Sequence, residues 1–289
     1  MQEPSMSTDS VDYQSDTGSD ERLASQPART KIEANFNVAR PPPKSSLRLS
    51  AKLLLQIQQL APNTRPVPVL EVWQPPLRKS KLTQDFHLRP KLKSGDLYAT
   101  RDEPFIFSAN LRKQSTKSDL TDSSDTHAVD KEIVAAICYP TAGEESTSVH
   151  FRDSECCWQT GAAAKPLEGN PCYRFTMRGE DNLDPSQPGR MILQWEKRDT
   201  AGKENAEEQF ILFLIDRQAR RKSRIATMSR VKLEIYVRKG SIIETLQLCL
   251  DLTKPSTRPG ANAHERLETW LFTLVLTLGV WVSQQEGWL

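Results

Sequence analysis

The longest apolar stretch of the chain is residues 270–282, near its C-terminal end. Apolar residues fill one face of this segment at helical spacing. The opposite face is apolar as well, through Phe272, Leu276 and Val280. A helix that is apolar on all sides must be buried nearly all round. Asn262 and Glu265 stand at the spacing of an N-cap and its capping-box partner, so the pattern predicts a buried helix over 263–283.

What surrounds this helix decides what kind of molecule the chain is. Its apolar stretch rises about 20 Å, whereas a bilayer core is about 30 Å thick and requires about 20 apolar residues. Apolar runs of about 10–14 residues more often mark a core helix. The flanks carry no cluster of cations that would orient an insertion. We therefore expect a helix buried in protein, with a short C-terminal membrane anchor through residues 270–282 as the alternative.

Most of the remaining chain alternates apolar and polar residues with a period of two, which is typical of strands. Predicted strands cover 67–73, 133–139, 148–158, 172–178, 191–197, 209–215, 231–237 and 246–252, with weaker ones at 96–98 and 104–108. In one of them Tyr173, Phe175 and Met177 alternate with polar or charged neighbours. Pro68 cannot donate to a ladder, so the first strand is expected at a sheet edge. Strands at this spacing indicate an antiparallel sandwich or barrel.

The strand series and the terminal helix together predict a mainly β fold. The expected architecture is an antiparallel β-barrel or sandwich wrapped around a hydrophobic C-terminal helix. A barrel supplies an apolar lining, and its closure removes exposed strand edges. A short N-terminal amphipathic helix is expected over 51–60, where Leu53, Leu54, Ile57 and Leu60 line one helical face and Pro62 ends the run.

Composition divides the chain into a polar leader and one domain. Residues 1–46 are rich in Ser, Asp, Thr, Gln and Pro, and such a segment buries too little apolar area to offset its ordering entropy. We predict a disordered leader over 1–46 and a single β-rich domain over 47–289. A Ser/Thr/Asp-rich stretch at 111–130 is predicted to be a disordered insert.

Cysteine usage indicates a cellular compartment, whereas net charge does not indicate a partner. The formal net charge is +2, which by itself indicates no class of partner. The first 21 residues contain six acids and no Lys or Arg, unlike a secretory signal. Five cysteines without a secreted-framework spacing favour a reducing compartment. We expect an intracellular, cytoplasmic protein.

Several segments occur in an order that resembles a known group. They are a short Leu/Gln-rich helix at 53–60, a Tyr-Arg-Phe strand at Tyr173–Phe175, a strand with Trp195, a strand that ends near Asp216 and leads into 224–230, and the terminal helix. In this order, residues 47–283 resemble uncharacterised fungal proteins with a tubby-like or phospholipid-scramblase-like barrel. The resemblance implies a twelve-strand barrel threaded by the C-terminal helix, and a phosphoinositide or membrane-surface role. It transfers no functional residue by position.

Catalytic and metal-binding patterns are sparse. The chain has four histidines and no Gly-x-Ser-x-Gly nucleophile elbow, which leaves Cys157 with His150 as the candidate pair. The candidate zinc ligands are His150, Cys156, Cys157 and Cys172. Their spacing is poor, because adjacent cysteines on a strand point to opposite faces. No Gly-rich phosphate loop occurs either, so we predict no catalytic residue, no metal and no cofactor.

Basic clusters give the main indication of a ligand. Between Arg217 and Lys239 there are nine Lys or Arg and one acid. The densest part, expected to be a hairpin turn, contains the candidate anion- or lipid-binding residues Arg217, Arg220, Arg221, Lys222 and Arg224. Guanidinium groups bind phosphates through forked donors, and anionic headgroups attract such clusters. A second group comprises Arg78, Lys79, Lys81, Arg89, Lys91 and Lys93. A solvated turn without a ligand is the alternative.

The sequence thus favours a non-enzymatic intracellular binding module that engages anionic phospholipid headgroups or a protein partner. Nucleic acid is disfavoured, because the aromatic residues that would stack on bases lie mostly on apolar faces. A C-terminally tail-anchored membrane protein is the first alternative, and an enzyme of unknown class is the second.

Overall fold

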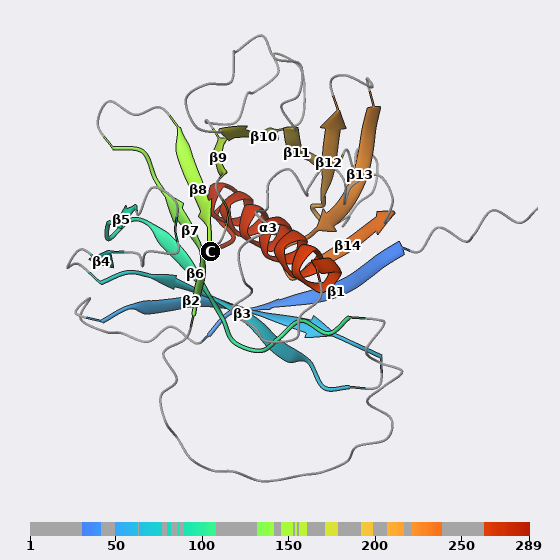
Figure 1. Cartoon of the computed structure of the whole chain (residues 1–289), viewed down its shortest axis with the longest axis horizontal. Helices are drawn as coiled ribbons and strands as arrows, with labels where there is room; N and C mark the ends of the chain where they lie inside the picture. The colour runs from blue at the N-terminus through green and yellow to red at the C-terminus, as the bar shows by residue number, and fades with distance from the viewer. Residues whose placement is uncertain are drawn as a thin grey trace, which may run out of the picture.

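Antiparallel strands form a closed barrel around one helix in the computed structural model of the chain (Figure 1). The structure describes residues 31–41, 50–62, 64–76, 80–81, 86, 90–107, 132–141, 146–152, 154, 156–160, 171–178, 192–198, 207–216, 221–238 and 263–289. Within this part, the barrel strands are β1 (Lys31–Ala39), β2 (Lys52–Leu60), β3 (Val67–Gln74), β6 (Leu97–Arg101), β7 (Ile133–Cys138), β8 (Thr147–Phe151), β9 (Cys157–Thr160), β10 (Cys172–Arg178), β11 (Ile192–Lys197), β12 (Phe210–Asp216), β13 (Arg221–Met228) and β14 (Lys232–Arg238). A separate ribbon consists of β4 (Ser80–Lys81) and β5 (Lys91–Leu92), and the helix is α3 (Ala263–Gln285).

Strand order in the barrel follows the order of the chain, with one exception. From β2 to β14, successive barrel strands are antiparallel neighbours, and only the β4–β5 ribbon lies apart. The exception is the pairing of the first strand with the last: Asn35 of β1 pairs with Leu60 of β2 on one side and with Glu234 of β14 on the other. The first strand therefore closes the barrel, and every described barrel strand has two neighbours. This confirms the predicted barrel class.

Alternating residues explain why these segments form the wall. In β10, Tyr173 and Phe175 are buried, whereas Arg174 between them is exposed. Their cross-strand partners on β11 follow the same rule, since Tyr173 pairs with Trp195 and Phe175 with Leu193. Because side chains of a strand alternate between faces, one set fills the barrel and the other set faces outward. The predictions for these strands are confirmed to within one residue at each end.

Helix α3 fills the barrel. Figure 1 shows it in red, with strands on all sides. The centre of the helix is almost free of solvent contact: Leu274, Val275, Leu278 and Val282 each have 0 % exposure. Residues Glu265–Gln285 are also long and apolar enough to cross a membrane, but 89 % of the most apolar window is buried inside the protein. The predicted buried helix is therefore confirmed, with its apolar surroundings supplied by its own barrel.

Aromatic rings connect both halves of the helix to the wall. Phe272 makes edge-to-face contacts with Phe36 and Phe105, at centroid distances of 5.7 and 5.4 Å. Toward the other end, Trp281 makes similar contacts with Tyr173 and Phe175, at 5.4 and 5.3 Å. Such pairs stabilise by about 0.5–1.5 kcal/mol beyond the area that they bury. They also fix the position of the helix along the barrel axis.

Polar contacts hold the C-terminal end of α3 at one mouth of the barrel. The hydroxyl of Tyr139 donates to Gln284, and that of Tyr173 donates to Glu286. The Lys197 ammonium lies 3.7 Å from the Glu286 carboxylate. The helix ends in a Schellman motif, in which Gly287 has a φ of 69° and Trp288 N donates to Ser283 O at 2.8 Å. Glycine adopts this left-handed conformation without strain.

The predicted amphipathic helix at 51–60 is wrong. This segment is strand β2, which pairs with β1 and β3. Leu55, Ile57 and Gln59 are buried in alternation, which is the period of a strand. Leu and Gln have good helix propensity, but backbone pairing on both sides outweighs it. The spacing of the leucines fits either element over so short a segment.

The structure also changes two other predictions, one on the N-terminal leader and one on the edge position of the strand at 67–73. Strand β1 lies inside the predicted leader 1–46, so this part of the segment belongs to the barrel. Its Phe36 is fully buried against the helix, and this burial offsets the ordering entropy of a polar segment. Strand β3 is not an edge strand, because it lies between β2 and β6. Pro68 is accommodated beside a register irregularity between Ile57 and Gln58.

Two further strand predictions differ from the structure, and several other predictions concern residues that the structure does not describe. The predicted strand at 148–158 is two strands, β8 and β9, and the segment 104–107 is not a strand. Residues 1–30, the insert at 111–130, the strand at 246–252 and the N-cap Asn262 lie outside the described residues.

Candidate functional site

Three of the five predicted anion-binding residues lie on the described part of the β12–β13 pair. Arg217 and Arg220 lie outside the described residues. Arg221, Lys222 and Arg224 are on β13, so the expectation that they form a turn is wrong for these three. All three side chains are exposed. They sit on a strand because Asp216, Ile215 and Phe213 of β12 pair with them one by one.

The alternation of β13 directs two of these cations outward together. Lys222 and Arg224 stand two residues apart and are exposed, while Ile225 is buried. Their partners Ile215 and Phe213 are half-buried, and Leu214 between these two is buried. Lys222, Arg224 and Phe213 therefore share the outer face of the barrel wall.

Lys222 is held by an aromatic ring and a carboxylate. Its ammonium lies 4.0 Å from the centroid of the Phe213 ring. It also donates to both carboxylate oxygens of Glu196 on β11, at 2.8 and 2.7 Å. The Lys222 and Glu196 side chains are 45 % and 29 % exposed, so water screens this ion pair.

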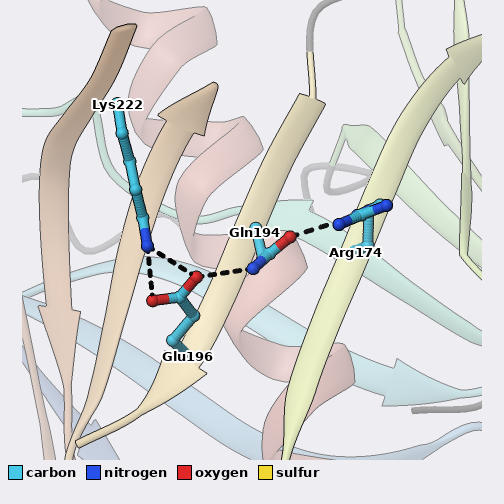
Figure 2. Close-up of polar contacts among 4 residues, drawn as sticks. All are labelled: Arg174, Gln194, Glu196 and Lys222. Carbon is cyan, nitrogen blue, oxygen red and sulfur yellow. Dashed lines mark hydrogen bonds and ion pairs between the residues drawn. The ribbon is translucent and has the colours of Figure 1, made fainter. Parts of the chain in front are cut away.

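The contact chain continues across the wall from Glu196 to β10. Gln194 donates from its amide nitrogen to Glu196 at 2.5 Å, and Arg174 donates from Nε to the Gln194 carbonyl oxygen at 3.1 Å. Figure 2 shows the four side chains in a row over the outer surface. We call Arg174, Gln194, Glu196 and Lys222 the polar ladder. It connects β10, β11 and β13, and its central Gln194 is only 8 % exposed.

Arg224 stacks on the next strand. Its guanidinium carbon lies 4.7 Å from the centroid of the Tyr236 ring on β14, and its Nε donates to the Tyr236 hydroxyl oxygen. Cations over aromatic faces contribute about 0.5–1 kcal/mol at exposed sites. The hydrogen bond from Lys232 is the main cause that lowers the pKa of nearby Glu234, and the charge of Arg224 lowers this pKa further.

Together these residues form a surface that we call the basic wall: Arg174, Lys222 and Arg224, with Phe213 and Tyr236, and with exposed Arg221 at the start of β13 next to Lys222. Its cations come from two strands, β10 and β13, and its rings from β12 and β14. Guanidinium forks suit the oxygen geometry of phosphate, and a lysine adds a point charge. Half-buried rings beside the cations can rest against the region where headgroups meet acyl chains. The arrangement is suited to an anionic surface.

The sequence prediction of the site missed Arg174, Gln194 and Glu196. The outward alternation of β10 and β11 already contained them, because Arg174 lies between two inward aromatics and Gln194 lies beside inward Leu193 and Trp195. The missing information was the pairing of β11 with β12 and of β12 with β13. That pairing brings Lys222 within reach of Glu196.

The other sequence candidates are separated from the basic wall. Lys91 and Lys93 of the second basic group are exposed near β5, Lys81 is on β4, and Arg78, Lys79 and Arg89 lie outside the described residues. His150 and Cys157 are cross-strand partners on β8 and β9, and each is 7 % exposed. The ring of His150 lies 3.0 Å from the Ser148 hydroxyl. Among the described residues, no group of three or more His, Cys, Asp or Glu is arranged to hold a metal.

Inside the barrel, a small cavity separates α3 from β2, β3, β6 and β7. Its volume is about 10 Å³, and its lining residues are apolar except for Thr277 and Tyr98. The Thr277 hydroxyl is buried and has no hydrogen-bond partner among the described residues. A cavity of this size holds about one water molecule, so it is too small for a ligand of metabolite size.

Comparison with known proteins adds no relative. The chain matches no protein-family model, no curated protein and no solved structure. The closed twelve-strand barrel around α3 agrees with the architecture implied by the tubby-like resemblance, but that resemblance stays a prediction.

Proposed function

We propose that this chain is a non-enzymatic binding module that docks through its basic wall on membranes rich in anionic phospholipid headgroups. The observation that supports the proposal is the exposure of Arg221, Lys222 and Arg224 on β13, with Lys222 and Arg224 together on the outer face of the barrel. Two of these cations lie over the rings of Phe213 and Tyr236. A rigid closed barrel presents them on a strand, so little ordering entropy is lost on binding.

Electrostatic attraction to phosphate would provide most of the binding. Anionic leaflets attract each nearby Lys or Arg by about 1 kcal/mol, and the attraction falls off within a Debye length. Such a surface is found on the cytoplasmic leaflet. This agrees with the cytoplasmic location that we propose from the cysteine usage.

Vesicle flotation tests the proposal. Wild-type protein should float with phosphatidylcholine vesicles that contain a phosphoinositide, should bind pure phosphatidylcholine vesicles much less, and should dissociate as the salt concentration rises. The double substitution R221Q/R224Q should weaken binding roughly 30-fold, from about 1 kcal/mol for each cation. The matched control is K91Q/K93Q, which removes the same charge from two exposed lysines near β5.

Two outcomes would contradict the lipid proposal. One is absence of flotation, or binding that does not depend on salt. The other is an equal loss in R221Q/R224Q and in K91Q/K93Q, which would assign binding to net charge rather than to the wall. Absence of flotation together with specific retention of a soluble protein by the intact wall would favour the protein-partner version.

A tail-anchored protein remains the second candidate, because α3 satisfies the length and composition of a membrane span. Carbonate extraction separates the two candidates. An anchored chain stays in the membrane pellet, whereas a chain that docks through the basic wall is released.

A further inference from the structure

Glu196 occupies the position on the basic wall where an external anion would meet Lys222. Its two oxygens lie 2.8 and 2.7 Å from the Lys222 ammonium, which is the geometry that a phosphate oxygen pair would adopt. The carboxylate and a headgroup phosphate therefore cannot both make these contacts. The next question is whether the carboxylate is placed there by chance or held.

The polar ladder holds the Glu196 carboxylate in this position. Gln194 donates to it at 2.5 Å, and Arg174 in turn fixes Gln194 at 3.1 Å (Figure 2). Gln194 is 8 % exposed, so its amide has few alternative orientations. The contact from Gln194 is independent of Lys222. The carboxylate thus stays beside the site even when the lysine moves away.

The ion pair is also weak enough to be displaced. Both side chains are partly exposed, and exposed pairs contribute about 0–1 kcal/mol. The Lys222 stem is retained on Phe213, with the ammonium 4.0 Å from the ring centroid, so it can exchange one anion for another without leaving the wall. Neighbouring Arg221 and Arg224 are exposed and add to the electrostatic attraction of a phosphate-bearing surface.

We propose that Glu196 is a built-in competitor that sets the threshold of the basic wall. Its carboxylate neutralises Lys222 until a surface with dense phosphate displaces it, and Gln194 positions it for this role. Sparse anionic charge then leaves the ion pair closed, whereas dense phosphate opens it. This inference rests on the proposed membrane function and names its regulation.

The test compares E196Q with wild-type protein on phosphatidylcholine vesicles that contain increasing fractions of phosphatidylinositol bisphosphate. E196Q should bind about fivefold more tightly, which corresponds to the release of one cation. Its half-saturation should move to a lower phosphoinositide fraction. The matched control is E208Q, because Glu208 forms a similar pair at 2.6 Å with Lys197, which follows Glu196 on β11 and alternates to the opposite face of the strand.

The gain in membrane affinity of E196Q must also depend on the presence of Lys222. In the background of K222Q, the substitution E196Q should have less than a twofold effect. An equal gain in E208Q, or a gain that persists in K222Q, would overturn the inference and assign the effect to net charge. Wild-type binding that E196Q leaves unchanged would overturn the inference alone, whereas absence of binding by every variant would overturn the proposed function with it.

Discussion

At the scale of single residues, the exposed cations of β13 are held by side chains from neighbouring strands: Lys222 pairs with Glu196, and Arg224 stacks on Tyr236. The cations Arg221, Lys222 and Arg224 were predicted as candidates, since local density of charge is visible in the chain. Their partners were not, because Glu196 and Tyr236 approach them only through strand pairing. Alternation shows which way a side chain points, but it does not show which neighbour it meets.

Two threonines one helical turn apart provide a test of how the helix is packed. Thr273 donates from its hydroxyl to Thr269 O at 2.8 Å, whereas Thr277 has a buried hydroxyl without a described partner. T277V should therefore leave stability unchanged or raise it by about 1 kcal/mol, because an unpaired buried hydroxyl is unfavourable. T273V, the matched control, should lower it by about 1 kcal/mol. Urea denaturation measures both, and equal losses would contradict this packing.

Tyr173 should make the protein sensitive to alkaline pH. Burial raises the pKa of its phenol, and the hydrogen bond and negative charge of Glu286 raise it further. The raised pKa means that the neutral phenol stabilises the folded state. This contribution is complete below the unfolded pKa of about 10 and is lost as pH rises through the folded pKa. Lys197 acts in the same direction, because its hydrogen bond with Glu208 is the main cause that raises its pKa.

Melting temperatures measured from neutral pH to pH 11 test this expectation. Wild-type protein should lose stability above about pH 10. Y173F should be less stable at neutral pH, because it loses the contact with Glu286, but its melting temperature should fall less steeply with rising pH. An unchanged slope in Y173F would show that this phenol does not carry the effect.

At the scale of elements, the errors have a common cause. Strands with a regular alternation, such as β10 and β11, were predicted within one residue of their observed ends. Strand β2 was mistaken for a helix, and β1 was assigned to a disordered leader. Both depend on pairing with other strands: β2 lies between its chain neighbours β1 and β3, and β1 also closes the barrel against β14, about two hundred residues away in the chain. Local propensity contains no information on such pairing.

Truncation tests the role of β1 as the closing strand. Removing residues 1–28 leaves every described strand intact and should not change stability by more than about 0.5 kcal/mol. Removing residues 1–46 deletes β1, exposes the paired edges of β2 and β14, and removes buried Phe36 from the helix. The longer truncation should aggregate or unfold. Size-exclusion chromatography and circular dichroism distinguish the two, and a stable monomer without residues 1–46 would contradict the assigned closure.

At the scale of the whole molecule, the barrel and α3 depend on each other. The barrel strands direct their large aromatic and aliphatic side chains inward, and α3 fills the space between these side chains. A helix that is apolar on every face requires such a lining in water. The sequence predicted this relation, because a closed sheet around the helix satisfies both patterns at once. The binding proposal depends on it, since the basic wall is rigid only if the barrel is filled.

Native-state hydrogen exchange in detergent-free buffer tests this relation most directly. If α3 is the core of its own barrel, the protein stays monodisperse without detergent. The amides around Leu274 should then exchange only through global unfolding, with the same free energy as the slowest amides of β11 and β12. Fast exchange around Leu274 while the strands stay protected, or a requirement for detergent, would show that the helix finds its apolar surroundings elsewhere.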